Sequence, residues 1–456
     1  MKFRIFDREL TEIETAEGKV TLRGLFVPFF IEQILMNLMS TVNTLILGHF
    51  SDEAVAAVGA AGQILGFVYT FYAVISGGAS VVISHRLGEG NSKEAEKAAF
   101  SSLVFVSAFS LVVGLILGYF AEPIMRLMNL TGEPLNMAVS YFEIVVRFSF
   151  VQSLITAISA ILRSYGMPKP AVIASVLMNA LNALFNYIVI MRPFKTPFSG
   201  TTGVAIGNTA ARIIAFIVIF IVLQNTHARI TFKGKRLSDL KCMKSVLRVG
   251  VPGGVANLSY SLSQVVTTSI LGILGTEAMS AKIYISSIVF YVYNAGYSMG
   301  MSASILMGWL TGAGEFEKAY KLNQRLLKMT IALNLTLSIV FFIFYRPILG
   351  LFTKNTEILD MAQAIFFIDI FVEFGRAFNH IEDYSLRGAG DVVVPMVVNI
   401  VSSWFMSILF GYLLGVYFGL GLKGCWIAFM LDECFRGSIL FVRFKSKKWM
   451  KTSAKI

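Results

Sequence analysis

Charged residues are scarce in this chain. Asp, Glu, Lys and Arg make up 14% of its 456 residues, whereas they make up roughly a quarter of a soluble domain. Apolar residues make up 56%, and the mean hydropathy is +0.71. A composition this apolar excludes an ordinary soluble protein and indicates a protein that crosses a membrane many times.

Cysteine is also rare. The three cysteines, Cys242, Cys425 and Cys434, form no CxxC pair and no metal-ligand spacing, which argues against a disulfide framework or a zinc site. No GKS or GKT follows Gly88-Glu-Gly90, so we expect no nucleotide site. No HExxH or paired catalytic motif is present either, and we therefore expect neither an enzyme nor a bound cofactor.

Long apolar segments fill most of the sequence. A bilayer core of roughly 30 Å needs about 20 apolar residues in a helix, and continuous segments of this kind favour helices over barrel strands. We predict an all-α membrane protein with twelve transmembrane helices. They cover approximately 25–50, 54–83, 98–120, 137–160, 169–191, 203–224, 249–274, 279–307, 328–345, 360–385, 393–416 and 424–443.

Lys and Arg fall mostly on one side of this arrangement. With both termini in the cytoplasm, the inside segments hold 28 of them and the outside loops hold 7, as the positive-inside rule requires. The net charge of +12 therefore reflects topology, and we expect no nucleic-acid partner. The segment that precedes the first span lacks the apolar core of a signal peptide, so we expect the first helix to direct insertion into the cell membrane.

The chain contains an internal repeat. Residues 27–97 align without a gap to 251–321, and 20 of these 71 positions are identical. The predicted parts are a cytoplasmic arm (1–23), a six-helix lobe (24–224), a basic linker (225–248), a second six-helix lobe (249–443) and a basic tail (444–456). Because each repeat has an even number of spans, the repeats run parallel, and we expect the substrate path between them.

Several stretches resemble the multidrug and toxic compound extrusion (MATE) transporters. They are VPF at Val27, TVNTLILGHFSDEAVAAVG from Thr41, RAFN…LRGAGD from Arg376 to Asp391, and LDECFRG before KSKKW. The resemblance covers about residues 22–449 and implies a pump that expels organic, often drug-like cations in exchange for inward H⁺ or Na⁺. Small organic molecules and membrane lipid are then the expected partners of a monomer, which would work by alternating access.

Acidic residues inside spans are candidates for coupling, because an intramembrane carboxylate is costly without a function or a partner. Glu32 has no basic residue nearby in its own helix and lies almost three turns before Asn43, on the same helix side. A polar stripe with increments of 4, 3, 4 and 3 follows in the tenth span, whereas Glu382 falls off it. The stripe comprises Asp369, Glu373, Arg376, His380 and Asp383.

Each of these residues also has a structural interpretation. Glu373 with Arg376, and Asp432 with Arg436 in the last span, have the spacing of intrahelical ion pairs. His380 could be a hydrogen-bonded interior residue or a proton relay, because imidazole changes charge near neutral pH. We predict cation coupling at Glu32, Asp369, Glu373 and Asp432, and leave the ion-pair alternative open.

The resemblance implies a second polar cluster in the first lobe. It assigns Asn43, Asn182, Asn186 and Thr209 to positions that in relatives include acids, so here the cluster is uncharged. Amide and hydroxyl oxygens can bind Na⁺ or substrate but do not titrate near pH 7. Relatives can also carry a Glu where this chain has Ala256. We therefore give more weight to the carboxylates that remain, Glu32, Asp369 and Glu373.

Aromatic residues suggest the substrate surface. FVYTFY and FYVYNAGY are related by the repeat and supply Tyr69, Tyr72, Tyr293 and Tyr297, although aromatic residues in spans mostly pack or face lipid. Rings near acids suit an organic cation, and we add Arg376 and His380 to this predicted cavity. A lipid or lipid-linked oligosaccharide flippase is the alternative, but it should line its path with more Arg and Lys than the few found in these spans.

Overall fold

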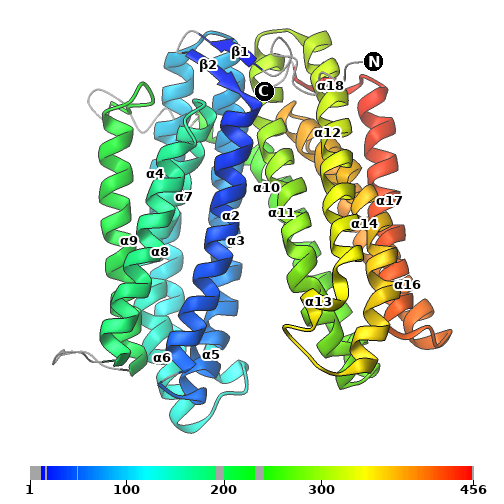
Figure 1. The fold of residues 1–456 in the computed structure, drawn as a ribbon. Helices are drawn as coiled ribbons and strands as arrows, with labels where there is room; N and C mark the ends of the chain where they lie inside the picture. The colour runs from blue at the N-terminus through cyan, green and yellow to red at the C-terminus, as the bar shows by residue number, and fades with distance from the viewer. Residues whose placement is uncertain (1–11, 16–17, 49, 192–199, 232–240, 454–456) are drawn as a thin grey trace. The chain divides into compact units, whose positions relative to one another are not determined.

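The computed structural model describes residues 12–15, 18–48, 50–191, 200–231 and 241–453. The description excludes the side chains of 12–15, 18–19, 39–45, 52, 241 and 453. The described residues form two compact units. The N-terminal lobe consists of the described residues within Val27–Leu87 and Asn91–Val251, and the C-terminal lobe of those within Pro252–Ile456, Met1–Phe26 and Gly88–Gly90. Both are helical bundles (Figure 1).

Apolar packing between long helices builds the N-terminal lobe. α9 packs on α6, α7 and α8, while α4 packs on α6 and α7. Its core includes Leu65, Met125 and Phe142. The helices are α2 (Leu22–Gly48), α3 (Asp52–Gly88), α4 (Ser92–Tyr119), α5 (Ala121–Leu127), α6 (Gly132–Arg147), α7 (Ser149–Ser164), α8 (Lys169–Met191) and α9 (Gly200–Gln224), together with the first part of α10 (Lys241–Ile273).

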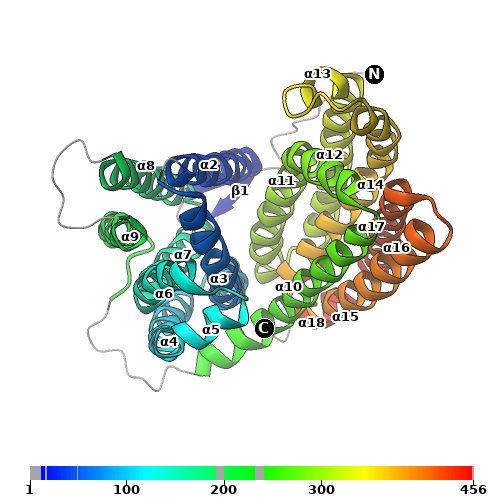
Figure 2. The same ribbon diagram turned by 90° about the horizontal axis from the view of Figure 1, so that it is seen from below.

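The C-terminal lobe is organised around α14, which packs on α11, α12 and α17; Figure 2 shows it among these helices. Its core includes Ile285, Phe366 and Trp426. After α10 follow α11 (Thr276–Gly312), α12 (Phe316–Ile343), α13 (Tyr345–Leu349), α14 (Thr356–Gly388), α15 (Val393–Ser402), the π-helical η2 (Ser403–Leu409), α16 (Phe410–Tyr412), η3 (Leu413–Tyr417), α17 (Gly421–Lys445) and α18 (Trp449–Ser453).

The two lobes repeat the same helix boundaries. α3 and α11 begin and end at positions that the sequence repeat aligns with each other, and so do α4 and α12. α14 corresponds to α6 and α7 together, but the N-terminal pair is bent by 47° at Phe148 while α14 is continuous. The predicted duplication is therefore confirmed in helix lengths, with one local difference between the repeats.

The prediction of an all-helical membrane-spanning fold is confirmed. Each of the twelve predicted segments lies on helices wherever the structure describes it, apart from single turn residues at Phe50, Phe120, Phe148, Leu274 and Phe344. Within the described residues, six helices are long and apolar enough to span a membrane, and the bent α6–α7 pair makes a seventh. The other five predicted spans include α14, whose polar stripe lowers its hydropathy.

The predicted N-terminal arm contains a short hairpin that the sequence interpretation did not anticipate. β1 (Glu12–Thr15) pairs antiparallel with β2 (Gly18–Thr21), with Glu12 opposite Thr21. The hairpin leads directly into α2 and lies before the first span. It therefore leaves the helical fold class unchanged.

Glycines bring α14 and α17 into close contact. A Cβ at Gly375 would lie 2.7 Å from the backbone nitrogen of Cys434, and one at Gly437 would lie 2.7 Å from the Cβ of Phe378. Membrane helices commonly use such small residues to approach each other, because lipid provides no hydrophobic force between them. This close approach places the polar side chains of the two helices within hydrogen-bonding distance.

We predict that Gly375→Ala separates α14 from α17. The added methyl group meets backbone atoms of Glu433 and Cys434 as well as the Cys434 Sγ, so the change should destabilise the protein by about 1–3 kcal/mol. Thermal unfolding of the purified protein in detergent measures this effect.

Gly411→Ala is the matched control. Gly411 is also buried in the C-terminal lobe, but its added Cβ would meet only the Cβ of Ala428, at 4.0 Å. Equal melting temperatures for the two variants would contradict the proposed close contact.

Candidate functional site

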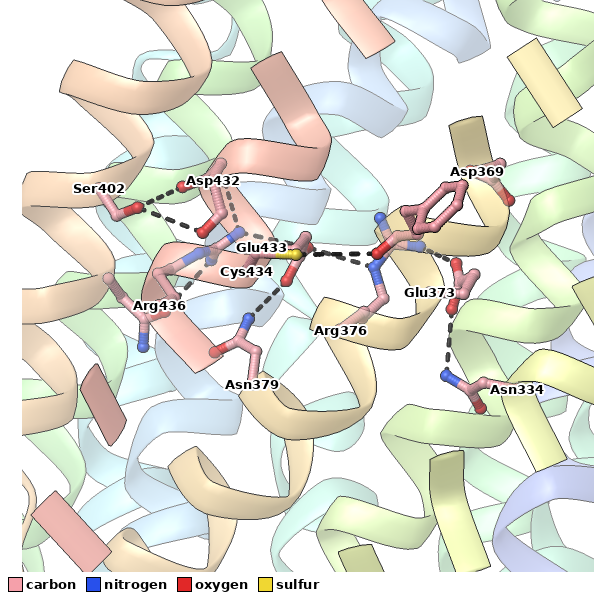
Figure 3. A network of polar contacts seen from close by, with 12 residues as sticks. Asn334, Asp369, Glu373, Arg376, Asn379, Ser402, Asp432, Glu433, Cys434 and Arg436 are labelled. Carbon is pink, nitrogen blue, oxygen red and sulfur yellow. Dashed lines mark hydrogen bonds and ion pairs between the residues drawn. The ribbon is translucent and has the colours of Figure 1, made fainter. Parts of the chain in front are cut away.

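Carboxyl and guanidinium groups form a buried network between α14 and α17 (Figure 3). We call it the carboxyl network and define it as Asp369, Glu373, Asp432 and Glu433 with Arg376 and Arg436. The four acids are each 5% exposed or less. Glu373, Asp432 and Glu433 share the two guanidiniums, in an interior where an unpaired charge is very costly.

Glu433 lies at the centre of this network. Its Oε1 accepts a hydrogen bond from Nε of Arg376 and forms an ion pair with Nη2 of Arg436, each at 3.2 Å. Its Oε2 accepts a hydrogen bond of 2.8 Å from the amide of Asn379. Glu433 therefore connects the arginines of two helices (Figure 3).

The two predicted intrahelical ion pairs are present, and each reaches a further helix. Glu373 pairs with Arg376, and its Oε2 accepts a 3.1 Å hydrogen bond from Asn334 on α12. Asp432 pairs with Arg436 at 2.6 Å, and its Oδ1 accepts a 2.5 Å hydrogen bond from the Ser402 hydroxyl on α15. These acids join four helices in addition to neutralising charge within one.

Asp369 differs from the other acids of the network. Its Oδ1 accepts a 3.1 Å hydrogen bond from the indole of Trp426, and no ion pair to it is found within the described residues. It is 2% exposed. The negative charge of the network is therefore least compensated at Asp369.

The predicted aromatic residues of the C-terminal lobe surround His380. Its ring lies 5.1 Å from that of Tyr293 and 6.4 Å from those of Tyr297 and Tyr384, in edge-on arrangements. Gly296 makes room for it, since a Cβ there would lie 2.9 Å from His380 Nδ1. The guanidinium of Arg376 lies 5.4 Å from the Tyr293 ring, so this aromatic cluster adjoins the network.

The remaining acid of the predicted stripe is paired elsewhere. Asp383 forms a 2.9 Å ion pair with Arg387 and also accepts a hydrogen bond from Asn399. All five stripe residues thus lie in the interior of the C-terminal lobe. Asp383 pairs with Arg387 nearer the end of α14, and Asn399 links it to the network by accepting a 3.2 Å hydrogen bond from Arg436.

Glu32 has a basic partner from another helix. Its Oε2 lies 2.5 Å from Nη2 of Arg163 on α7, and its Oε1 accepts a 3.1 Å hydrogen bond from the Ser175 hydroxyl on α8. The guanidinium also lies over the Phe29 ring, 4.6 Å from its centroid. Glu32 is thus a neutralised, hydrogen-bonded carboxylate rather than an isolated one.

The structure describes the side chains of three of the four residues predicted to form the uncharged cluster of the N-terminal lobe. The Asn186 amide donates a 2.8 Å hydrogen bond to Asn182, and both residues are buried. The Thr209 hydroxyl donates to the carbonyl of Ala205 within its own helix. Asn43 lies on α2, but its side chain is outside the description.

Tyr69 and Tyr72 make polar contacts within the N-terminal lobe. The Tyr69 hydroxyl accepts a 2.6 Å hydrogen bond from Arg212, and the Tyr72 hydroxyl lies 2.8 Å from that of Ser149. Tyr72 is 1% exposed. Its ring therefore packs inside the bundle, whereas Tyr69 is only half-buried.

Sequence interpretation missed Glu433, although a usable signal was present. Glu433 is the repeat counterpart of Thr209, a residue that the family resemblance selects in the other lobe. The contact of Arg163 with Glu32 was also missed, because it crosses helices. In the sequence, Arg163 stands out only as the repeat counterpart of Arg387.

Two segments of the chain match the MatE family, residues 28–188 and 252–413. The uncharacterized transporter YisQ of Bacillus subtilis is 33% identical over 438 residues, which are 96% of each chain. A probable multidrug resistance protein NorM of Thermotoga maritima is 27% identical over 99% of this chain and 97% of its own.

The fold is similar to that of solved MATE structures. A crystal structure of MATE in complex with MaD3S has a TM-score of 0.86 and 20% identity, covering 95% of this chain and 96% of the other. An outward-facing multidrug resistance MATE family transporter of the MOP superfamily has a TM-score of 0.82 and 20% identity, covering 95% of this chain and 96% of the other. The helical fold, the double family match and the 33% identity to a transporter together place the chain in the MATE family of membrane transporters.

Proposed function

We propose that this transporter exports amphipathic organic cations, including drugs, in exchange for H⁺ or Na⁺. The names of several relatives, such as the probable multidrug resistance protein NorM, support a role in drug export. We place the protein in the cytoplasmic membrane with both termini inside, following the distribution of Lys and Arg. The coupling cation binds, in this proposal, at the carboxyl network.

The observation that carries the proposal is the charge imbalance of the network. Three buried carboxyls share two guanidiniums, and the fourth, Asp369, has only an indole N–H as its hydrogen-bond donor within the described residues. One proton or Na⁺ reduces the excess negative charge, and so does an organic cation. The coupling cation and the organic substrate can therefore be attracted to the same charges, which is one requirement for exchange.

Exchange further requires that the cation bind one conformation better than the other, because equal affinity shifts no equilibrium. The carboxyl network joins α12, α14, α15 and α17 through side-chain contacts. Added positive charge would weaken the electrostatic hold of the carboxylates on Arg376 and Arg436. In this proposal, that weakening is how cation binding changes helix packing in the lobe.

The aromatic cluster supports an organic cation as the exported substrate. Tyr293 and Tyr297 stack with their centroids 6.1 Å apart, next to His380 and Arg376. Ring faces attract desolvated cations. A flippase would instead need several guanidiniums available for phosphate. Arg163, Arg376 and Arg436 are each paired with carboxylates, which leaves Arg212, a donor to the Tyr69 hydroxyl, as the exception among these four.

Gradients imposed on proteoliposomes test the coupling directly. We expect an inward H⁺ or Na⁺ gradient, applied separately at zero membrane potential, to drive ethidium out against its own gradient. Ethidium movement that responds to neither gradient would contradict antiport, and phospholipid scrambling by the same vesicles would favour the flippase.

Asp369→Asn should uncouple transport while leaving the fold intact. The change removes a charge but keeps a group that can accept the Trp426 hydrogen bond. A lost interaction of about 1.4 kcal/mol already lowers a rate about tenfold, so we expect gradient-driven ethidium export to fall at least that far. Glu315→Gln, which neutralises an exposed carboxylate on the same lobe, is the control and should export normally.

Glu32→Gln tests whether the buried pair of the N-terminal lobe is structural. Removing one member of a buried ion pair leaves the other charge uncompensated, at a cost of about 3–5 kcal/mol. We therefore expect a lower melting temperature for Glu32→Gln and recovery of most of the loss in the double variant with Arg163→Gln. Unchanged melting together with loss of gradient-driven export would instead make Glu32 a coupling residue.

A further inference from the structure

Glu382 is a buried acid outside the carboxyl network. It lies on α14 one residue from the polar stripe and is 0% exposed. Its Oε2 accepts a 3.2 Å hydrogen bond from the amide of Asn323 on α12, a residue that is 1% exposed. Its Oε1 is buried and has no hydrogen-bond partner within the described residues.

The arginines of the lobe interior do not neutralise Glu382. Arg376 pairs with Glu373 and Glu433, Arg387 with Asp383, and Arg436 with Asp432 and Glu433. Each of these guanidiniums is therefore paired with carboxylates other than that of Glu382. Among the described ion pairs none includes Glu382.

The helices packed on α14 supply few other ionisable groups. α11 has none between Ser298 and Gly312, where it contacts the last turns of α14. On α12, Lys321 and Lys328 are exposed and Arg325 is half-buried. α17 contributes Glu433, Arg436 and Arg443, the last paired with Asp391 at 2.7 Å.

An ionised carboxylate in this position would be unstable. It would be removed from water with one neutral amide donor and no opposite charge, and such groups bind a proton instead of remaining charged. The proton would reside on Oε1, because Oε2 accepts the Asn323 hydrogen bond. The neutral acid then needs no counter-ion.

The duplication indicates that this polar pair is not needed to build the fold. The repeat counterparts of Glu382 and Asn323 are Ile158 and Ala99, both 0% exposed in the N-terminal lobe. The same helix contact is thus made with an apolar pair in one lobe and a polar pair in the other. A buried acid kept where an apolar residue suffices points to a functional role.

We propose that Glu382, supported by Asn323, is a proton-binding site separate from the carboxyl network and exchanges one proton per transport cycle. The role of Glu382 in coupling rests on the proposed antiport function. Proton binding by Glu382 does not depend on that function. Oε1 gains a proton to form the neutral acid and loses it to water when helix movement exposes the site. Asn323 is a positioning residue that holds the carboxyl in place.

Infrared spectroscopy of the reconstituted full-length protein tests the proton site without reference to transport. At pH 7 the wild type should show the carbonyl stretch of a protonated carboxylic acid, and Glu382→Gln should lose one such component. Asn323→Ala should shift that component by removing its hydrogen bond. Glu317→Gln, an exposed change on α12, should leave the spectrum unaltered.

A spectrum that is the same in Glu382→Gln and wild type would overturn the proposal, and so would a component that Asn323→Ala does not move. If Glu382→Gln folds poorly, the double variant Glu382→Ile with Asn323→Ala reproduces the apolar pair of the other lobe. We expect it to melt at or above the wild-type temperature and to lack the same component.

Coupling is tested separately, at zero membrane potential with a pH gradient of one unit. One proton fewer per cycle should lower the ethidium gradient that Glu382→Gln sustains by about tenfold relative to wild type. An equal gradient in both would overturn a role for Glu382 in coupling. Failure of the wild type to sustain any gradient would instead refute H⁺ as the coupling ion, and the infrared result would still decide whether Glu382 binds a proton.

Discussion

Neutralisation of buried charge is the constraint on which the C-terminal lobe depends. Arg376 and Arg436 lie on different helices, and Glu433 contacts both. A guanidinium in the membrane interior is costly without a partner, so the contacts of Glu433 with both arginines favour one register of α14 and α17. Gly375 and Gly437 permit the close approach that this register requires. Helix packing and electrostatics therefore specify the same arrangement, and a change in the charge of the network acts directly on the packing.

The duplicated backbone carries two different interiors. Tyr72 in one repeat corresponds to Gly296 in the other, and the space freed by the glycine holds His380. Ser149, Asn208 and Thr209 correspond to Glu373, Asp432 and Glu433. Arg163 and Arg387 correspond to each other but take their carboxylates from different places, Glu32 on α2 and Asp383 on α14 itself. Both arginines of this pair are thus neutralised, whereas Arg212, the counterpart of Arg436, donates to the Tyr69 hydroxyl, and excess acid accumulates in the C-terminal lobe.

Sequence patterns predicted what depends on single helices. Long apolar segments predicted the spans, and spacings of three and four predicted the stripe from Asp369 to Asp383. Contacts between helices were not predictable in this way, because Arg163 lies 131 residues from Glu32 and Glu433 lies 57 from Arg376. The spacing of four residues drew attention to Asp432 and Arg436 as an ion pair. Glu433, the residue directly after Asp432, was therefore overlooked. The hairpin of β1 and β2 was missed because four-residue strands carry little periodic signal.

The position of the excess acid explains why cation binding should affect the C-terminal lobe more than the N-terminal lobe. Glu32 is matched by Arg163, so this pair carries no excess negative charge. In the carboxyl network each added positive charge removes repulsion among the four acids and loosens the hold on two arginines. Glu382 extends this argument to a contact that the other repeat makes with Ile158 and Ala99. Deprotonation there would place an uncompensated charge between α12 and α14, which packing alone cannot accommodate, so proton release and separation of these helices must occur together.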